Sequence, residues 1–247
     1  MKDDLRLWLL TACVAPMGVP TLVRHNPAVR ACDYRTSFGN WIPSLLSDER
    51  NHVLIVENSA YDLSGVMGRF LSKDRVHLIQ YIEDEAISRL GKGNAEARMF
   101  SRTKEWLMTA PWDFKDVAKV TGRLWIPNFR KAVGETPSDG NYIRCRLRGD
   151  LSQVDTRFFV ASTRVWMEHF ADLALSVREG DGVYLEHVVA DLVLSLIRQD
   201  VQRLGFSEPP RFVGTSGSTG MDYGGRLDPA HRWIEKVTGR QVRSSFF

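Results

Sequence analysis

The chain has few cysteines, no long apolar segment and little net charge. Its three cysteines, Cys13, Cys32 and Cys145, are widely spaced and form no CxxC pair, which disfavours a structural zinc site and a disulfide framework. No apolar run is long enough to cross a bilayer. A net charge of +3 over 247 residues is far below a nucleic-acid-binding excess. We therefore expect no nucleic-acid partner, whereas an anionic ligand or a membrane surface is compatible with this charge.

Two widespread enzyme motifs are also missing. No GxGxxG follows the first apolar segment, which argues against an NAD-binding Rossmann enzyme. No GxSxG follows a strand pattern, which argues against Ser-His-Asp hydrolysis. There is no internal repeat and no low-complexity linker, and the composition of 43% hydrophobic and 26% charged residues is that of an ordinary globular protein. We expect a single domain over 1–247.

The first half of the chain alternates between apolar strand patterns and helical patterns. The expected strands are Leu5–Val14, His52–Val56, Val76–Ile82 and Val117–Ile126. The expected helices begin at Pro27, span Leu63–Leu71 and span Asn94–Ala110. Such alternation predicts a layered α/β domain with a mostly parallel sheet. Gly122, inside the fourth pattern, predicts a bulge or a close approach by a ligand or another backbone.

The first of these segments also ends in Leu10-Thr11-Ala12-Cys13, which looks like a bacterial lipoprotein processing box. Its apolar core is shorter than that of a signal peptide, so we interpret the segment as a strand.

The second half is less regular. We expect a half-exposed strand at Tyr142–Arg148, a second strand or hairpin partner at Gln153–Ser162 and a last short strand at Arg211–Gly214. Two helices are expected at Thr163–Leu175 and Tyr184–Leu204. The segment 224–247 is a basic tail.

One stretch, Gly91 to Arg98, suits an anionic ligand. It follows an apolar run and opens a long helical pattern. Glycines there let a backbone approach a ligand closely, and the free N–H groups of a helix start favour a phosphate. Lys92 and Arg98 add positive charge. The alternative is an ordinary polar loop that begins a helix.

Several short motifs resemble, in their order and spacing, those of bacterial glycosyltransferases from capsule and surface-polysaccharide clusters, which are related to the nucleotide-sugar GT-A type. The motifs are Thr11-Ala12-Cys13, Val56-Glu57-Asn58, Gly91-Lys92-Gly93-Asn94-Ala95-Glu96, Lys119-Val120-Thr121-Gly122-Arg123, Asp155-Thr156-Arg157-Phe158-Phe159, Tyr184-Leu185-Glu186-His187 and Ser216-Gly217-Ser218-Thr219-Gly220. The resemblance spans most of 5–223.

The resemblance implies a Rossmann-like GT-A-type α/β fold with a more irregular C-terminal half. It implies a nucleotide-sugar-binding half at 5–130 and an acceptor and catalytic half at 131–223. The implied donor-binding residues are Thr11, Ala12, Glu57, Asn58, Lys92, Gly93, Arg98, Thr121, Arg123, Ser216, Ser218 and Thr219. Three of these segments could instead be purely structural: a helix-capping turn at 57–59, a bulge at 121–123 and a flexible linker at 216–220.

The resemblance has one departure, which concerns metal binding. Members of the wider fold often carry an Asp-x-Asp motif after the fourth strand that holds a divalent metal. Here that region reads Thr121-Gly122-Arg123, and the nearest acid in chain order is Asp155. Arginine and lysine can neutralise a leaving diphosphate instead. We therefore assign no metal ligand, and Mn²⁺ or Mg²⁺ stays an alternative.

Sugar transfer with inversion needs a general base, and the resemblance points to Glu186 and His187, with Asp155 as the next candidate. Glu186 could also have a structural role, because an acidic residue in the first turn of a helix complements the helix dipole. His187 could equally be a packed helix residue.

The resemblance thus predicts transfer from a nucleotide-sugar donor to a saccharide or lipid-linked acceptor. The expected location is the cytoplasm, with peripheral association at the inner face of the membrane as an alternative. The rival hypothesis is a non-catalytic nucleotide- or phosphate-binding accessory protein of the same pathway.

Overall fold

The computed structural model describes residues 4–17, 22–137 and 140–223, so the basic tail at 224–247 lies outside the described residues. Within the described ranges, seven strands form one sheet. They are β1 Leu5–Ala12, β2 Asn51–Glu57, β3 Val76–Gln80, β4 Phe114–Thr121, β5 Tyr142–Arg144, β6 Phe158–Ser162 and β7 Gln202–Leu204.

The sheet is mixed and mostly parallel, with the strand order β3-β2-β1-β4-β6-β5-β7. β1 lies at its centre and pairs in parallel with β2 and β4, and β3 extends the parallel part beyond β2. β6 runs antiparallel to both β4 and β5, and β7 is parallel to β5. The predicted α/β fold class is confirmed.

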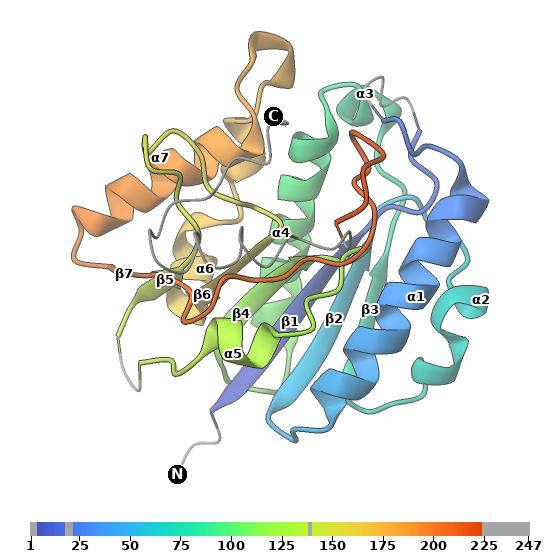
Figure 1. The fold of residues 1–247 in the computed structure, drawn as a ribbon, viewed down its shortest axis with the longest axis horizontal. Coiled ribbons are helices and arrows are strands. Elements are labelled where there is room, and N and C mark those ends of the chain that lie inside the picture. Colours follow the sequence, from blue (N-terminus) through green and yellow to red (C-terminus); the bar gives the residue numbers. More distant parts are fainter. Residues whose placement is uncertain (1–3, 18–21, 138–139, 224–247) are drawn as a thin grey trace, which may run out of the picture.

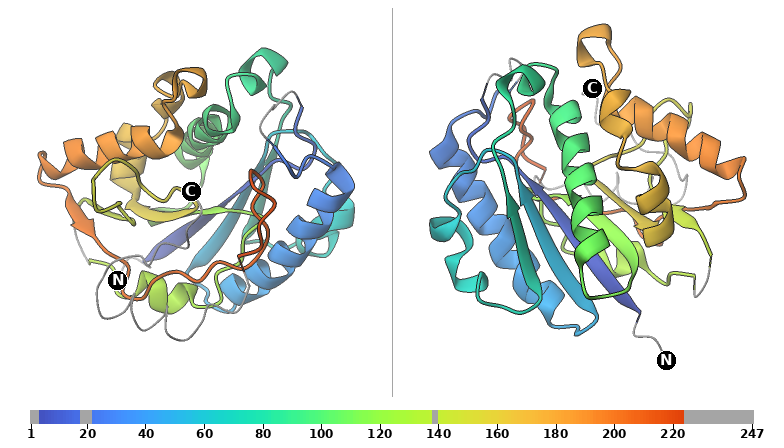
Figure 2. Two further views of the ribbon diagram at one scale, coloured as in Figure 1. Left: turned by 45° about the horizontal axis from the view of Figure 1, so that its top comes forward. Right: turned by 180° about the vertical axis from the view of Figure 1, so that it is seen from behind.

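Helices cover both faces of the sheet, giving three layers (Figures 1 and 2). The helices are α1 Pro27–Leu46, α2 Ser64–Met67, α3 Glu85–Ser88, α4 Lys92–Thr109, α5 Phe129–Val133, α6 Thr163–His169 and α7 Leu185–Ile197, with 3₁₀ turns η1 Gly68–Phe70, η2 Leu173–Leu175 and η3 Glu179–Asp181. One face packs against α1, α2 and α5, and the other against α4, α6 and α7.

Local sequence explains where α1 begins and how it binds the sheet. The side chain of Asn26 accepts hydrogen bonds from two backbone N–H groups of the first turn, and Pro27 occupies the position where a missing N–H is harmless. The buried ring of Trp41 lies 5.5 Å from that of Trp8 in β1. Burial of large aromatic rings such as these stabilises the packing of α1 against the sheet.

The fourth strand ends earlier than the sequence predicted. β4 stops at Thr121, so Gly122 follows the strand and the predicted internal bulge is wrong. The predicted close approach of another backbone is correct, because Gly122 N donates to Thr11 O at 2.9 Å. A Cβ atom on Gly122 would lie 2.7 Å from that same oxygen. Glycine is therefore needed where the chain leaves β4 against the end of β1.

The helix predicted at Tyr184–Leu204 is also shorter than expected. α7 ends at Ile197, and the last three residues of the predicted helix form β7. Asp200 has a φ of 61°, a left-handed conformation that ends the helical course. The periodic pattern did not reveal this break, because Val201 continues the apolar spacing of α7.

Two strand predictions in the second half need correction. The expected half-exposed strand at Tyr142–Arg148 is only the buried β5. Its Arg144 side chain lies inside, where it donates to the carbonyl oxygens of Glu135 and Gly205 at 2.6 and 2.5 Å. Arg211–Gly214 is not a strand, because only Val213 forms an isolated bridge there, with Trp125.

Across the described ranges, no helix combines the length and the apolar character needed to cross a membrane.

Candidate functional site

The carboxyl-terminal ends of β1, β2 and β4 meet at one edge of the sheet. Ala12 pairs with Glu57 in β2, and Thr11 pairs with Thr121 in β4. The chain builds outward from β1 through β2 and β3, then returns to place β4 on the other side of β1, so the strand order reverses between β1 and β4. In open α/β sheets, ligands bind in the crevice outside the strand ends at such a point. Thr11 and Thr121 flank this position.

An ion pair between a buried lysine and a partly buried glutamate lies beside this edge. The fully buried Lys119 of β4 places its Nζ 2.7 Å from Glu96 Oε1 in α4 and donates to Thr156 O at 2.5 Å. Thr11 Oγ1 donates to the same Glu96 oxygen at 2.8 Å. Burial alone would raise the pKa of Glu96, but the charge of Lys119 and these hydrogen bonds outweigh it and lower the pKa. The Glu96 carboxylate therefore favours its ionised form, and the pair joins β1, β4, α4 and the segment before β6.

Glu186 connects to this network through a threonine. Glu186 lies in the first turn of α7, half-buried, and its Oε1 accepts a hydrogen bond from Thr156 Oγ1 at 3.2 Å. Its backbone oxygen accepts from Val154 N at 3.0 Å. Thr156 thus links Glu186 to Lys119. Its hydroxyl donates to the Glu186 carboxylate, and its backbone carbonyl accepts from Lys119 Nζ.

The other two predicted catalytic residues make local structural contacts. His187 Nδ1 accepts from Tyr184 N at 3.3 Å, and its Nε2 lies 2.9 Å from Gln153 Nε2. Asp155 accepts two hydrogen bonds from the Arg157 guanidinium, at 2.8 and 2.6 Å. Burial would raise the pKa of Asp155, but Arg157 lowers it below its ordinary value. Of the three predicted residues, Glu186 is the one that contacts the strand-edge network.

The side chain of Glu179 lies against the start of α4. This residue belongs to η3, and the sequence did not single it out. Gly93 N donates to Glu179 Oε1 at 2.5 Å. Cβ atoms at Gly91 and Gly93 would lie 2.2 and 2.7 Å from the two carboxylate oxygens. Burial, with Glu186 as a further negative charge, raises the pKa of Glu179 despite the opposing effects of Gly93 and Lys92. The glycines therefore admit a carboxylate of the protein itself, and a ligand phosphate at this helix start would have to displace it.

The predicted serine and threonine loop lies against two predicted basic residues. The segment after β7 runs back across the molecule toward the start of α4 (Figure 1). Lys92 Nζ donates to Ser218 Oγ, and Arg123 Nη1 donates to Thr215 O at 2.7 Å. A Cβ atom on Gly217 would lie 2.5 Å from the Arg123 guanidinium. The loop is thus placed between the two cations.

The remaining loop residues stabilise its turn. Ser216 is buried, and its Oγ accepts from Thr219 N at 3.2 Å. In the second turn of α4, Arg98 is half-buried, and its Nε donates to Asn94 Oδ1 at 3.4 Å.

Glu57 and Asn58, at the end of β2, differ in how fully they are bonded. The carboxylate of Glu57 is fully buried and accepts from the backbone N–H groups of Val14, Ser59 and Tyr61 at 3.0 to 3.1 Å. The Glu57 carboxylate therefore holds the surrounding loops in place through these hydrogen bonds. Asn58 is 5% exposed, and its Oδ1 has no hydrogen-bond partner among the described residues.

Few side chains at this edge could ligate the divalent metal that the resemblance brought into question. Within the ranges that the structure describes, no group of three or more histidine, cysteine, aspartate or glutamate side chains could hold a metal ion. The end of β4 offers Thr121 and Arg123, and Asp155 is bound to Arg157. We therefore derive no step through a metal.

Four residues of this region were not predicted as site residues: Lys119, Glu96, Thr156 and Glu179. A signal was present for Lys119, because a lysine inside the apolar run of a central strand needs a buried partner. For Glu179 no local pattern pointed to α4, since the contact depends on tertiary structure.

Comparisons with known proteins give similarity of structure but not of sequence. No family model matches the chain, and no curated protein matches it. The chain is similar to the inositol-1-phosphate CTP transferase from T. maritima, with a TM-score of 0.49, 13% identity and coverage of 90% of this chain and 94% of that one.

Two glycosyltransferase structures are also similar. For the galactosyltransferase LgtC with donor and acceptor sugar analogs, the TM-score is 0.46 at 9% identity, over 76% of this chain and 70% of that one. For the glycosyltransferase GlyE of Streptococcus pneumoniae TIGR4, it is 0.47 at 10% identity, over 81% and 45%. Similarities this weak establish no activity for the chain.

Proposed function

We propose that the chain is a glycosyltransferase that transfers a sugar from a nucleotide-sugar donor to a saccharide or lipid-linked acceptor in surface-polysaccharide biosynthesis. We place its action in the cytoplasm, at the inner face of the membrane where a lipid-linked acceptor would lie. The proposal is supported by the motif order of the sequence and by the chemistry gathered at the carboxyl edge of the sheet.

The observation that carries donor binding is the unpaired Asn58 Oδ1 after β2, next to the carboxyl end of β1. A buried acceptor without a partner costs about 1–3 kcal/mol of folding free energy, so such atoms usually serve a purpose. A nucleobase N–H or a ribose hydroxyl could donate to Asn58 and remove that cost. Neighbouring Ala12, whose backbone oxygen accepts from Asn58 N at 3.2 Å, belongs to β1, at whose carboxyl end ligands of such sheets bind.

Positive charge for the leaving diphosphate would come from Lys92 and Arg123. Both cations contact the loop at 215–218, so a diphosphate that replaced these loop contacts would meet a lysine and an arginine together. Arginine and lysine can neutralise phosphate oxygens through charge-assisted hydrogen bonds. We therefore propose transfer that depends on basic side chains and needs no metal.

Glu186 would act as the general base toward the acceptor hydroxyl. The Thr156 hydroxyl donates to its carboxylate and so helps to hold that carboxylate in position. The half-buried position of Glu186 leaves part of the residue open to an acceptor. The carboxylate takes the hydroxyl proton as the oxygen attacks the donor sugar, and the nucleoside diphosphate leaves.

Calorimetry with UDP-, GDP-, CMP- and dTDP-sugars, each with and without manganese, tests donor binding. A ligand at about 100 times its Kd also stabilises the protein by roughly 2.7 kcal/mol, which a melting scan detects. Asn58→Leu should weaken donor binding while leaving the unfolding temperature equal or higher, because it removes an unsatisfied buried atom. If no nucleotide sugar binds, the proposal is lost.

Activity assays separate the remaining alternatives. Transfer should survive a metal chelator, and activity that disappears with the chelator and returns with manganese would contradict the metal-independent mechanism. Tight donor binding with no transfer to any saccharide or lipid-linked acceptor would favour the non-catalytic accessory protein.

A further inference from the structure

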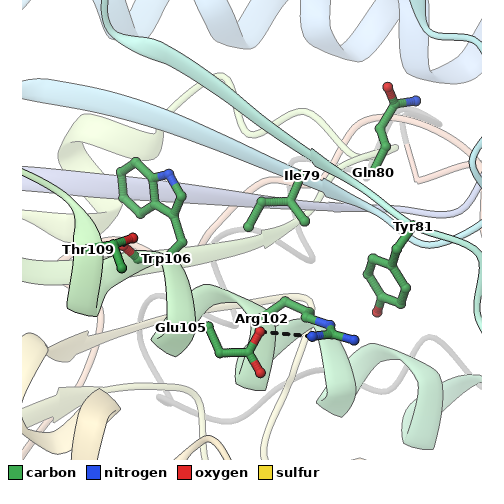
Figure 3. A pocket seen from close by; sticks show the side chains of 7 residues that line it. All are labelled: Ile79, Gln80, Tyr81, Arg102, Glu105, Trp106 and Thr109. Carbon is green, nitrogen blue, oxygen red and sulfur yellow. Dashed lines mark hydrogen bonds and ion pairs between the residues drawn. The ribbon is translucent and has the colours of Figure 1, made fainter.

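A shallow groove lies between the edge strand β3 and α4. Its volume is about 410 Å³, within the range of roughly 300–1,000 Å³ typical of small-molecule sites. Figure 3 shows Ile79 and Tyr81 on the strand side and Arg102, Glu105 and Trp106 on the helix side. None of the residues that line it belongs to the network around Lys119 and Glu186. The groove is therefore a separate feature from the proposed transfer site.

Two aromatic rings line the groove, and both are held in place. The ring of Trp106 lies 4.9 Å from that of His77 and 5.9 Å from that of Phe114, on the side facing the sheet. The Tyr81 hydroxyl lies 3.4 Å from Glu83 Oε2, and its backbone N–H donates to the last residue of β2 at 3.0 Å. Rigid aromatic surfaces with polar tips suit ligands that are partly apolar and partly polar.

Two of the polar side chains that line the groove form an ion pair on α4. Arg102 Nη1 donates to Glu105 Oε2 at 2.8 Å, and the guanidinium lies 5.3 Å from the centre of the Tyr81 ring. Arg102 and Trp106 are four residues apart and share one face of the helix. A guanidinium has five donors and a carboxylate has about four acceptor positions, and their mutual bond uses one of each. The pair can therefore both donate to and accept from hydroxyl groups.

This lining selects among ligand classes. The charges of Arg102 and Glu105 balance, so neither an anion nor a cation gains a net attraction. A wholly apolar ligand would cover charged groups that are 49% and 61% exposed to water, at a cost. A sugar ring fits both requirements, because the C–H groups of one face pack on an aromatic ring while the hydroxyls at its rim bond to polar groups.

We propose that the groove between β3 and α4 binds a neutral sugar unit of a saccharide, at a second site separate from the transfer site. This site needs no nucleotide, so it can exist even if the chain transfers no sugar. A protein that acts on saccharide chains would bind one sugar unit of the chain here, away from the site of transfer.

The test uses the full chain labelled with ¹⁵N and no nucleotide. The probes are methyl glycosides of glucose, galactose, N-acetylglucosamine and rhamnose, and linear disaccharides of the same sugars. The Trp106 indole N–H signal is identified by its loss in Trp106→Phe. We expect at least one probe to shift this signal in a saturable way.

A matched pair of double variants locates the binding. Arg102→Ala with Glu105→Ala removes the groove's ion pair and should weaken binding at least tenfold. Arg164→Ala with Glu168→Ala removes a similar exposed pair on α6 and should leave affinity within twofold. Both pairs are exposed and contribute little to stability, so both variants should fold, as a melting scan will verify.

Two outcomes would overturn the proposal. One is that no probe shifts the Trp106 signal. The other is that the variant at Arg102 and Glu105 binds as tightly as the unmodified chain. Neither result bears on donor binding at Asn58, and a failure of donor binding leaves this test unchanged.

Discussion

Glu186 is the residue on which the proposed chemistry depends. It is anchored by α7, whose buried side chains include Leu185, Val189 and Val193, and it is bonded to Thr156. These contacts fix a carboxylate at the carboxyl edge of the sheet. Catalytic and structural roles predict different behaviour for the same substitutions.

Glu186→Gln keeps the size of the side chain and removes its basicity. We expect turnover to fall by about two orders of magnitude or more, since general-base catalysis typically contributes about 10²–10⁴-fold, while donor affinity changes little. A role limited to the helix dipole predicts near-normal turnover and a stability loss of roughly 0.3–1 kcal/mol. Measuring turnover and unfolding temperature together distinguishes the two, and unchanged turnover would leave His187 or Asp155 as the next candidate.

Thr156→Val removes one hydroxyl and nearly preserves shape. Because that hydroxyl donates to the carboxylate of Glu186 and helps to orient it, its loss should lower turnover while donor affinity changes little. Thr156→Ser keeps the donor and should restore turnover. Turnover that Thr156→Val leaves unchanged would show that the contact only packs the two residues together.

At the scale of elements, the start of α4 is joined to η3 rather than left free. Gly91 has a φ of 116°, and a side chain there would meet Glu179. The two glycines therefore let a turn from the second half of the chain lie against a helix of the first half.

Gly91→Ala should destabilise the fold by about 1–3 kcal/mol, because alanine at this φ is strained and collides with the Glu179 carboxylate. Gly180→Ala is the matched control, since a Cβ atom there meets nothing within 4 Å. Denaturant unfolding of both variants measures the difference. Equal stabilities would mean that η3 moves away from α4 without cost.

At the scale of the whole molecule, a pair of histidines, the buried His52 and the half-buried His77, makes stability depend on pH. His52 Nδ1 lies 3.3 Å from His77 Nε2, at the opposite end of the strands from Glu57. Burial, followed by the charges of His77 and Arg75, lowers the pKa of His52 from 6.5 to about 4. The unfolded chain then binds a proton near pH 6.5 that the folded chain refuses until about pH 4.

The free energy of unfolding should therefore rise as the pH increases from about 4 to 6.5, with His52 contributing up to roughly 3 kcal/mol. This contribution is lost as the pH falls through the same range. His52→Phe should flatten this part of the stability profile. His25→Phe, at an exposed position, should not. Denaturant titrations across that pH range measure the slope, and parallel slopes for all three proteins would contradict the assignment.

Strand and helix patterns were sufficient for the parallel half of the sheet, because β1, β2 and β3 are apolar runs separated by helical segments. They were not sufficient for β7, since Val201 continues the spacing of α7 and only the backbone turn at Asp200 separates them. At the site, Thr11 of β1 pairs with Thr121 of β4. Chain order could not show that Glu57 is used by loop N–H groups, because those donors reach it only through tertiary structure.

The central position of β1 has a consequence for how the chain is made. β1 and β2 are close in sequence, but the other edge of β1 pairs with β4, which lies more than a hundred residues further along the sequence at the paired positions Leu9 and Lys119. Contacts between such distant segments form slowly. A growing chain on the ribosome therefore carries an open apolar strand edge for a long interval, the kind of surface that invites misassociation and chaperone binding.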